Sequence, residues 1–353
     1  MIYSNIQTLV FDSSNILLDQ KKSFDRNNIP SRLEPIQGFH DALMNLQKNY
    51  QMIFATDADL SINEVKDILK SVDLDKFFDS IFSKKSPLDY FRTIQNTCEI
   101  PANQITIIGK AYKTNIMGGY QAGWKTIWYN PHHLLAPGLL PIQDAEFSDI
   151  SILENILQKE DFPSWNTCQT WMIEQGTSPQ LFKHVLMVAS IAYTIAILLQ
   201  RKGYEINPLL AHRGGFLHDL CKFATPSNQP PEKSHGEKAS ILLREKGYPQ
   251  LADIARTHGF HCLTNVEKRP QSWEQKLVNY GDRLVERDQL VGIETRMKRL
   301  CERYHLSPQF YGKCISAINE LQEEICQALS FSNEELFNTL EQILIKGTET
   351  VQY

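Results

Sequence analysis

The chain has 353 residues, of which 42% are hydrophobic and 22% charged, and its formal net charge at pH 7 is -5. This length exceeds one ordinary domain, and the composition is that of a globular protein with sizeable cores, so we expect two domains. The mild negative charge gives no sign of a nucleic-acid or anionic membrane partner. The seven cysteines form no CxxC pair, which favours reduced thiols and argues against a zinc–thiolate site.

Targeting and membrane signals are weak. Residues 1–11 show no basic segment followed by a long apolar run, so we expect no signal peptide and a cytoplasmic location. The most apolar stretch, residues 185–199, is interrupted by Ser190, Tyr193 and Thr194. It is shorter than the roughly 20 residues needed to cross a bilayer, so we interpret it as a buried helix.

Strand-like and helix-like segments alternate in the first part of the chain. Helical spacing of apolar residues is found at 39–48, 63–69 and 88–97. Short β-prone runs occur at 8–11, 52–55, 80–82, 105–108 and 126–129. This alternation implies right-handed crossovers and a parallel sheet, in which ligands bind at the carboxyl ends of the strands.

The second part of the chain is almost entirely helical. Residues 130–149 are rich in proline and histidine and lack periodicity, so we interpret them as a tail leading to a linker. Beyond Ile150 apolar residues recur at three and four positions, and Ser332 with Glu335 predicts a capping box. The sequence therefore predicts an α/β domain with a Rossmann-like parallel sheet at 1–149 and an all-helical domain at 150–353.

Histidines and aspartates recur in the helical part, mostly where helical segments begin or end. Imidazoles with carboxylates, and no thiolates at matching spacing, are the ligands that Fe, Mn, Zn, Co and Ni accept. A lone histidine is more often an ordinary core or surface residue, but an ordered set indicates a metal centre. The set consists of His184, the adjacent pair His218 and Asp219, His235, His258 and Asp282.

The segments that carry this set resemble the HD superfamily of metal-dependent phosphohydrolases. They are the run beginning at His184, Gly215-Phe-Leu-His-Asp-Leu-Cys-Lys222, Ser234-His-Gly-Glu-Lys-Ala, Ile254-Ala-Arg-Thr-His258 and Leu277-Val-Asn-Tyr-Gly-Asp282. The resemblance covers about residues 165–300 and implies an all-helical fold. It implies His184, His218, Asp219 and Asp282 as basic metal ligands. His235 and His258 match the additional histidines of two-metal members, and His261 is a spare candidate.

The resemblance implies a hydrolytic mechanism with two divalent transition-metal ions. Ions bridged by Asp219 would lower the pKa of a bound water and supply hydroxide for attack on a phosphoester or phosphoanhydride. Lys222 and Arg283 are candidate phosphate clamps and Arg287 is a third, although each is equally compatible with a salt-bridged surface. The implied substrate is a small phosphorylated metabolite, in the first instance a nucleotide. Self-association into a homo-oligomer stays open.

Two other functions remain open. Some HD proteins use nearly the same ligands as a di-iron oxygenase, and the ligands alone do not separate the two activities. The third reading is a non-catalytic, nucleotide-sensing scaffold with a structural metal. Retention of all six ligands argues against that third reading.

The first part of the chain resembles the haloacid dehalogenase-like (HAD-like) superfamily over about residues 5–130. The resemblance rests on Leu9-Val-Phe-Asp12, Phe54-Ala-Thr56, Lys85 and Ile107-Ile-Gly109. By this resemblance Asp12 matches the nucleophile, Thr56 the conserved hydroxyl and Lys85 the charge-stabilising lysine. The segment between Asp12 and Thr56 is short, so we expect little or no cap and do not favour a metal-free dehalogenase.

Three positions depart from the HAD-like pattern. Ser14 stands where the acid/base aspartate belongs, Lys110 where a magnesium-binding aspartate is expected, and Asn115 in place of an acidic residue. Magnesium requires hard anionic oxygens, and a serine is no general acid at neutral pH. We therefore predict a catalytically degenerate HAD-like domain without magnesium. The residues that remain of the HAD-like site, Asp12, Thr56, Lys85 and Lys110, would hold a phosphate without cleaving it and give the domain a regulatory role. The alternative is that they only form salt bridges with one another.

Overall fold

The computed structural model describes residues 6–12, 35–56, 60–83, 90–158, 162–223 and 234–346. The chain divides into two compact units, residues 1–134 with 142–160 and residues 135–141 with 161–353. The division lies beyond the predicted boundary at 149–150. The reason is that helix α6 (Leu153–Gln158) buries Leu153 and Leu157 in the core of the first unit.

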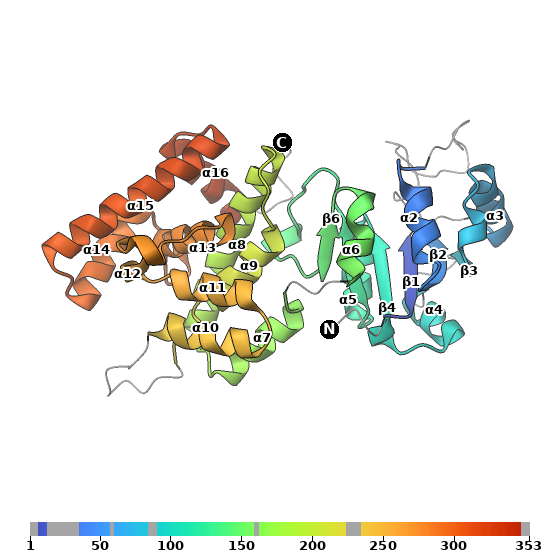
Figure 1. The fold of residues 1–353 in the computed structure, drawn as a ribbon, viewed down its shortest axis with the longest axis horizontal. Coiled ribbons are helices and arrows are strands. Elements are labelled where there is room, and N and C mark those ends of the chain that lie inside the picture. Colours follow the sequence, from blue (N-terminus) through green and yellow to red (C-terminus); the bar gives the residue numbers. More distant parts are fainter. Residues whose placement is uncertain are drawn as a thin grey trace. The chain divides into compact units, whose positions relative to one another are not determined.

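The first unit contains a parallel six-stranded sheet in the order β3-β2-β1-β4-β5-β6 (Figure 1). All five predicted strands are confirmed. A sixth, β6, lies in the segment that was interpreted as a linker tail. The strands are β1 (Thr8–Asp12), β2 (Gln51–Thr56), β3 (Ser80–Ser83), β4 (Ile105–Gly109), β5 (Lys125–Tyr129) and β6 (Ala145–Phe147).

Alternate residues of the central strands feed two cores, one on each face of the sheet. Leu9 and Phe11 of β1 belong to the core that α2 (Phe39–Leu46), α3 (Ile62–Ser71) and α6 cover. Val10 of the same strand belongs to the other core, with Ile94 of α4 (Tyr90–Cys98). This period of two is what a strand buried on both faces requires. A π-helix (Tyr112–Ile116) runs into α5 (Met117–Gln121) after β4.

The described residues of the second unit are helical, as predicted, apart from connecting loops and one short antiparallel pair, β7 (Val285–Glu286) with β8 (Gln289–Leu290). Each of these strands has two residues, too few for a detectable alternation. The helices are α7 (Trp165–Glu174), α8 (Pro179–Arg201), α9 (Pro208–Leu217), α10 (His235–Glu245), α11 (Pro249–Thr257), α12 (Phe260–Leu263), α13 (Trp273–Leu284), α14 (Ile293–Tyr304), α15 (Pro308–Leu329) and α16 (Asn333–Lys346).

Helix α8 is the central helix of this unit. Ser178 caps it by accepting a hydrogen bond from the Leu181 amide, and Pro179 follows as its first residue. By length and composition it is apolar enough to cross a membrane, but 72% of its most apolar window is buried inside the protein. Burial of this extent agrees with the predicted core helix.

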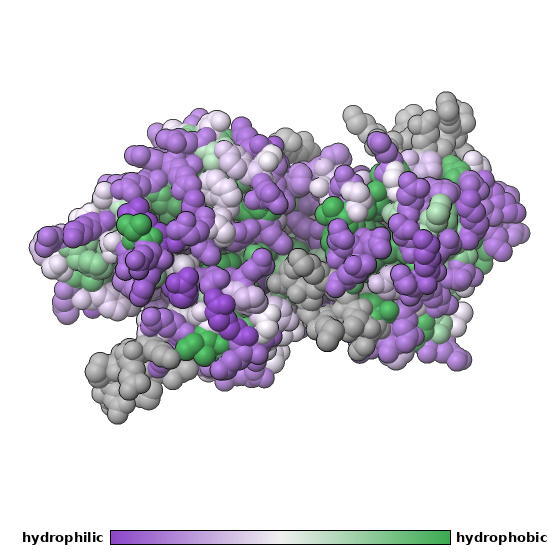
Figure 2. All heavy atoms as spheres, viewed as in Figure 1, coloured by the Kyte–Doolittle hydropathy of each residue, from purple (hydrophilic) through white to green (hydrophobic). Residues whose placement is uncertain are grey.

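Figure 2 shows a mainly hydrophilic surface with scattered hydrophobic residues on the face in view.

Helices α8 and α9 pack unusually close together at Gly215. A Cβ atom added to Gly215 would lie 2.7 Å from the Cα atom of Ala189 on α8, a distance that real side chains do not adopt. Glycine therefore lets the two backbones approach each other. This contact brings the histidine of α8 close to the histidine that follows α9.

Candidate metal centre

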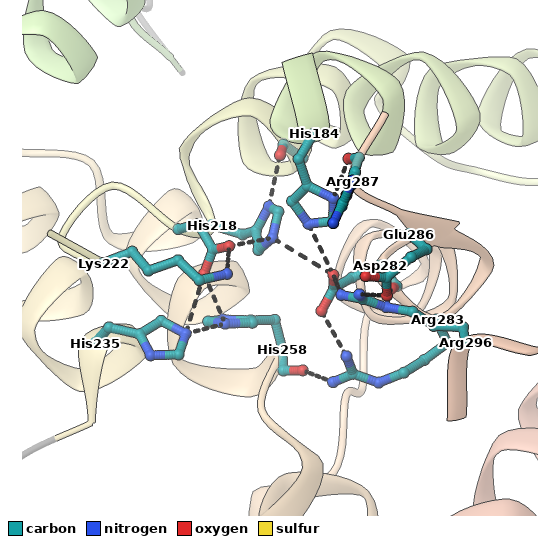
Figure 3. Close-up of polar contacts among 12 residues, drawn as sticks. His184, His218, Lys222, His235, His258, Asp282, Arg283, Glu286, Arg287 and Arg296 are labelled. Carbon is teal, nitrogen blue, oxygen red and sulfur yellow. Dashed lines mark hydrogen bonds and ion pairs between the residues drawn. The ribbon is translucent and has the colours of Figure 1, made fainter. Parts of the chain in front are cut away.

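The six predicted ligands come together in the second unit (Figure 3). His184 is on α8, whereas His218 and Asp219 lie directly after α9. His235 is the first residue of α10, His258 follows the last residue of α11, and Asp282 is near the end of α13. Five separate helices thus supply the six side chains, mainly from their ends.

The ligand atoms form two groups that share Asp219. One group is His184, His218 and Asp219, the other is Asp219, His235 and His258, and within each the ligand atoms lie within 4.8 Å of one another. The Oδ1 atom of Asp219 is 3.0 Å from His235 Nε2 and 3.6 Å from His258 Nε2. Its Oδ2 atom is 3.5 Å from His218 Nε2. The two oxygens of one carboxylate therefore face different groups.

Asp282 completes the first group from the opposite side. Its Oδ1 atom is 3.0 Å from His184 Nε2 and 4.0 Å from His218 Nε2. The carboxylate is buried, with 6% of the residue exposed. A second acid beside two imidazoles gives this group two histidines and two carboxylates, which suits a divalent transition metal.

Three of the histidines are oriented by backbone carbonyl groups. His184 donates from Nδ1 to the carbonyl of Arg287 at 2.9 Å, and His218 donates from Nδ1 to Gly215 at 2.7 Å. His258 donates from Nδ1 to Ala255 at 2.5 Å. These Nδ1 bonds leave the Nε2 atoms facing the cluster, where His184 Nε2 is 3.0 Å from Asp282 Oδ1, His258 Nε2 is 2.9 Å from His235 Nε2 and His218 Nε2 is 3.5 Å from Asp219 Oδ2. Such bonds are how proteins fix the tautomer of metal-ligating histidines.

Two buried polar atoms at this point have no hydrogen-bond partner among the described residues. They are His218 Nε2 and Asp219 Oδ1, in residues that are 0% and 1% exposed. The His235 nitrogen lies 3.0 Å from Asp219 Oδ1 but lacks hydrogen-bond geometry. A polar atom buried without a hydrogen-bond partner is costly, and a cation bound to each of these two atoms would remove that cost. The residues therefore fit the divalent metal that their chemistry implies.

The electrostatics of the cluster keep its two acids ionised and His258 neutral. Burial alone would raise the pKa of Asp219, but Lys222 and His218 hold that pKa well below its usual range. Burial likewise opposes ionisation of Asp282, yet Arg283 and His184 keep its pKa well below the ordinary value. Burial, followed by the charges of neighbouring histidines, lowers the pKa of His258 to about 3. Both acids are thus ionised and His258 is neutral at pH 7.

A cavity of about 360 Å³ opens beside these ligands. Lys222 lines it and contacts Asp219 Oδ2, and the surrounding carboxylates raise the pKa of Lys222 despite its burial. His261, the spare ligand candidate, also lines the cavity but belongs to neither ligand group. The cavity lining further includes Arg256, Phe260, Leu300, Tyr304 and Phe310.

The other two predicted clamps, Arg283 and Arg287, form hydrogen bonds with the predicted metal ligands. Arg283 donates from Nη1 to Asp282 Oδ2 at 2.5 Å and from Nη2 to the carbonyl of His258, and its guanidinium lies 4.1 Å from the centre of the Phe260 ring. It is 2% exposed. Arg287, in the turn between β7 and β8 with φ 58°, contributes its backbone carbonyl to His184. Both arginines therefore hold ligands in position.

A network of ion pairs that supports Asp282 was not predicted from the sequence. Arg296 of α14, 5% exposed, donates from Nη2 to Asp282 Oδ1 at 3.3 Å and from Nη1 to Glu286 Oε2 at 2.5 Å. Glu286 of β7 also accepts from Arg303 at 2.7 Å. Helix α14 carries many charged residues, so nothing in the sequence distinguishes a buried arginine there from a solvated one.

The predicted HAD-like residues lie at the carboxyl edge of the sheet. Asp12 and Thr56 are the last residues of β1 and β2, and both are buried. Lys110 follows β4, and its carbonyl accepts a hydrogen bond from the Trp128 indole. The buried Asn115 accepts a bond from the Ala111 amide at 3.0 Å. Ser14 and Lys85 lie outside the described residues.

The family model named HD domain matches residues 181–287, a range that includes all six ligands. The uncharacterized protein MJ0778 of Methanocaldococcus jannaschii is 30% identical over 137 residues, which are 36% of this chain and 78% of that protein. The chain belongs to the HD-domain family. The predicted assignment of the second unit as a metal-dependent phosphohydrolase domain is thereby confirmed.

Other similarities concern HAD-like hydrolases and a nucleotidase. Pyrimidine 5'-nucleotidase PynA of Streptococcus pneumoniae is 30% identical over 109 residues, which are 29% of this chain and 45% of that protein. A 2-haloacid dehalogenase from Pseudomonas syringae shares 21% identity over 36% of this chain and 54% of its own, with a TM-score of 0.31. A haloacid dehalogenase-like family hydrolase from Xanthomonas campestris shares 17% identity over 43% and 95%, with a TM-score of 0.32.

Proposed function

We propose that the HD domain hydrolyses a phosphoester or phosphoanhydride of a small phosphorylated metabolite, a nucleotide in the first instance, with two divalent transition-metal ions. The observation that carries the proposal is the position of Asp219, whose two oxygens face two different ligand groups. His184, His218 and Asp282 would hold one ion with Asp219, and His235 and His258 the other. When bound, such ions supply a hydroxide nucleophile at neutral pH and offset charge on phosphate.

The protein's own groups account for binding and orientation of the substrate. Lys222 lies at the edge of the cavity with 35% of its side chain exposed, and its raised pKa keeps the ammonium charged. A charged ammonium beside the bridging acid is placed to bind a phosphoryl oxygen. Arg283 fixes the orientation of Asp282 and of the chain at His258. Of the three predicted clamps, Lys222 is therefore the proposed phosphate contact, and Arg283 is a positioning residue.

We further propose that the HAD-like domain has a structural or regulatory role and no magnesium-dependent chemistry. Asn115 uses its side-chain oxygen within its own turn, where an acidic metal ligand would be needed. Lys110 adds a positive charge at the end of β4, which further opposes cation binding. Asp12, Thr56 and Lys110 remain a candidate phosphate-binding edge for a regulatory ligand.

Metal content and activity on a nucleotide panel test the hydrolase. Wild type is expected to hold about two transition-metal ions and to release phosphate or nucleotide, and Asp219→Ala to lose both metals and hydrolysis. Asp12→Ala is the matched control, since it removes a buried acid of the other unit. Hydrolysis that survives Asp219→Ala and disappears in Asp12→Ala would reverse the assignment of the two domains.

The same preparations separate hydrolase from oxygenase. Two irons with oxygen uptake, dependence on a reductant and no phosphate release would move the protein to the di-iron oxygenase class. Metal binding with neither phosphate release nor oxygen uptake would leave the scaffold reading. Phosphate release under anaerobic conditions with manganese or cobalt would exclude both alternatives.

A further inference from the structure

One face of helix α14 lines the metal cavity over its whole length. Arg296, Leu300 and Tyr304 are spaced by four residues and all three line the cavity. Residues at this spacing lie above one another on one side of a helix. The face begins with a buried cation, continues with a leucine and ends with an aromatic ring.

The position of this face relative to the ligands is fixed at one end. Arg296 contacts Asp282 Oδ1 at 3.3 Å, so the first residue of the face touches the metal ligands (Figure 3). A helix rises about 1.5 Å per residue, which places the backbone of Leu300 about 6 Å and that of Tyr304 about 12 Å further along the axis. The cavity therefore changes from charged to apolar with distance from the ligands along this helix.

Other elements extend the apolar wall. Phe310 of α15 and Phe260 of α12 also line the cavity. The Phe260 ring carries the Arg283 guanidinium on one face, which orders that ring. Tyr304 is 54% exposed, so its ring is accessible to a ligand that enters the cavity.

Cationic and imidazole side chains also line the cavity. Lys222 and Arg256 line it together with His261. Tyr304 and Lys222 both line this cavity, so the phenol and the ammonium border the same space. A ligand between them would meet an ammonium on one side and aromatic carbon on the other.

We propose that Tyr304, with Leu300 and Phe310, forms a subsite for a planar aromatic group of the substrate. The inference rests on the proposed hydrolase function and narrows its substrate class. The substrate is an organic phosphate that carries an aromatic ring, such as a nucleobase, and inorganic pyrophosphate or polyphosphate is bound less tightly. Stacking on Tyr304 holds the ring while the phosphate reaches Lys222 and the metal ligands.

Equilibrium binding to the manganese-loaded full-length chain tests the subsite independently of catalysis. The probes are α,β-methylene-ADP and methylenediphosphonate, which share the non-hydrolysable phosphonate and differ by the nucleoside. Wild type is expected to bind the nucleoside-bearing probe at least about tenfold more tightly, the effect of one stacked base. Tyr304→Ala should remove most of this difference and Tyr304→Phe should keep it. Ile345→Ala, an exposed apolar residue of α16 outside the cavity lining, is the matched control.

Two results would overturn the subsite. One is a wild-type protein that binds both probes equally. The other is a folded Tyr304→Ala variant that keeps the full preference, with its circular dichroism and melting temperature as checks on folding. A clear preference without hydrolysis of any nucleotide would refute the hydrolase and leave the subsite standing. Hydrolysis of a nucleotide by a protein that binds both probes equally would refute the subsite and leave the hydrolase standing.

Discussion

At the carboxyl edge of the sheet, the replaced HAD-like positions take part in local contacts, with Asn115 bonded to Ala111 and the carbonyl of Lys110 bonded to Trp128. In the metal centre, His218 Nε2 and Asp219 Oδ1 are buried without a hydrogen-bond partner among the described residues. Polar groups are thus satisfied by local hydrogen bonds in one region and converge without such partners in the other. The difference teaches that the convergence of unsatisfied polar atoms, more than residue type, is what marks the second region as a candidate site.

The largest expected effect comes from removing one ligand group at a time. His235→Gln affects only the group of Asp219, His235 and His258, and His184→Gln affects only the other group. Each variant should retain about one metal ion of two. Each should lose at least about 100-fold in hydrolysis, because loss of even an outer partner of a ligand costs about 10–100-fold. Elemental analysis and phosphate release are the measurements. Loss of both ions in both variants would contradict two separable groups.

A smaller loss of metal affinity is expected when the arginine that contacts Asp282 is replaced. Arg296→Met removes the contacts to Asp282 and Glu286, so manganese affinity should fall about 10–100-fold. Arg296→Lys should recover part of the loss, because it keeps the charge without the two-pronged geometry. Arg303→Met is the control, since Arg303 contacts Glu286 at the half-exposed end of the network. Calorimetric titration with manganese measures all three. An unchanged affinity in Arg296→Met would reduce this network to a structural role.

In the first unit, a buried polar residue should matter only for stability. Asn115→Ala leaves the Ala111 amide without its acceptor and should lower the free energy of unfolding by about 1–3 kcal/mol. Denaturant unfolding measures this loss, and nucleotide hydrolysis should stay at the wild-type rate. A large loss of hydrolysis at unchanged stability would show that this edge of the sheet controls the HD domain.

The smallest effect concerns a buried histidine outside the metal centre. Burial and then the Arg213 charge hold the pKa of His212 well below its ordinary value. The unfolded chain therefore binds a proton near pH 6.5 that the folded chain does not bind. Stability from this group is complete above that pH and falls below it by up to about 1.4 kcal/mol per pH unit. Urea unfolding of His212→Gln between pH 7.5 and 5.5 should show a shallower loss than wild type. An equal loss of stability per pH unit in wild type and in His212→Gln would contradict a lowered pKa of His212.

The sequence was sufficient for most of the fold. Clear patterns were present at 105–108 and 185–199, and the structure confirms these segments as parts of β4 and α8. The strand β6 (Ala145–Phe147) was missed, because three residues within a proline-rich segment carry no detectable alternation. The other strands were thus predicted from the pattern of their own residues. The strand β6 instead forms by pairing with β5, which lies outside the short window in which such a pattern is detected.

The candidate site could be predicted only in part. The six ligands were named from their order and spacing, and the structure brings them together. The roles of the arginines were not readable, because Arg283 and Arg296 differ from solvated residues only in what their guanidinium groups contact. Tyr304 was missed for a similar reason: its place in the cavity depends on how α14 packs, and α14 contributes no ligand.

The close approach at Gly215 has a consequence for how the centre is tuned. His184 and His218 are not bonded to each other, and their separation is set by how near α8 and α9 lie. An alanine at 215 would force the two backbones apart, and the histidines would move with them. Helix packing at a single glycine therefore sets the space between these two candidate ligands.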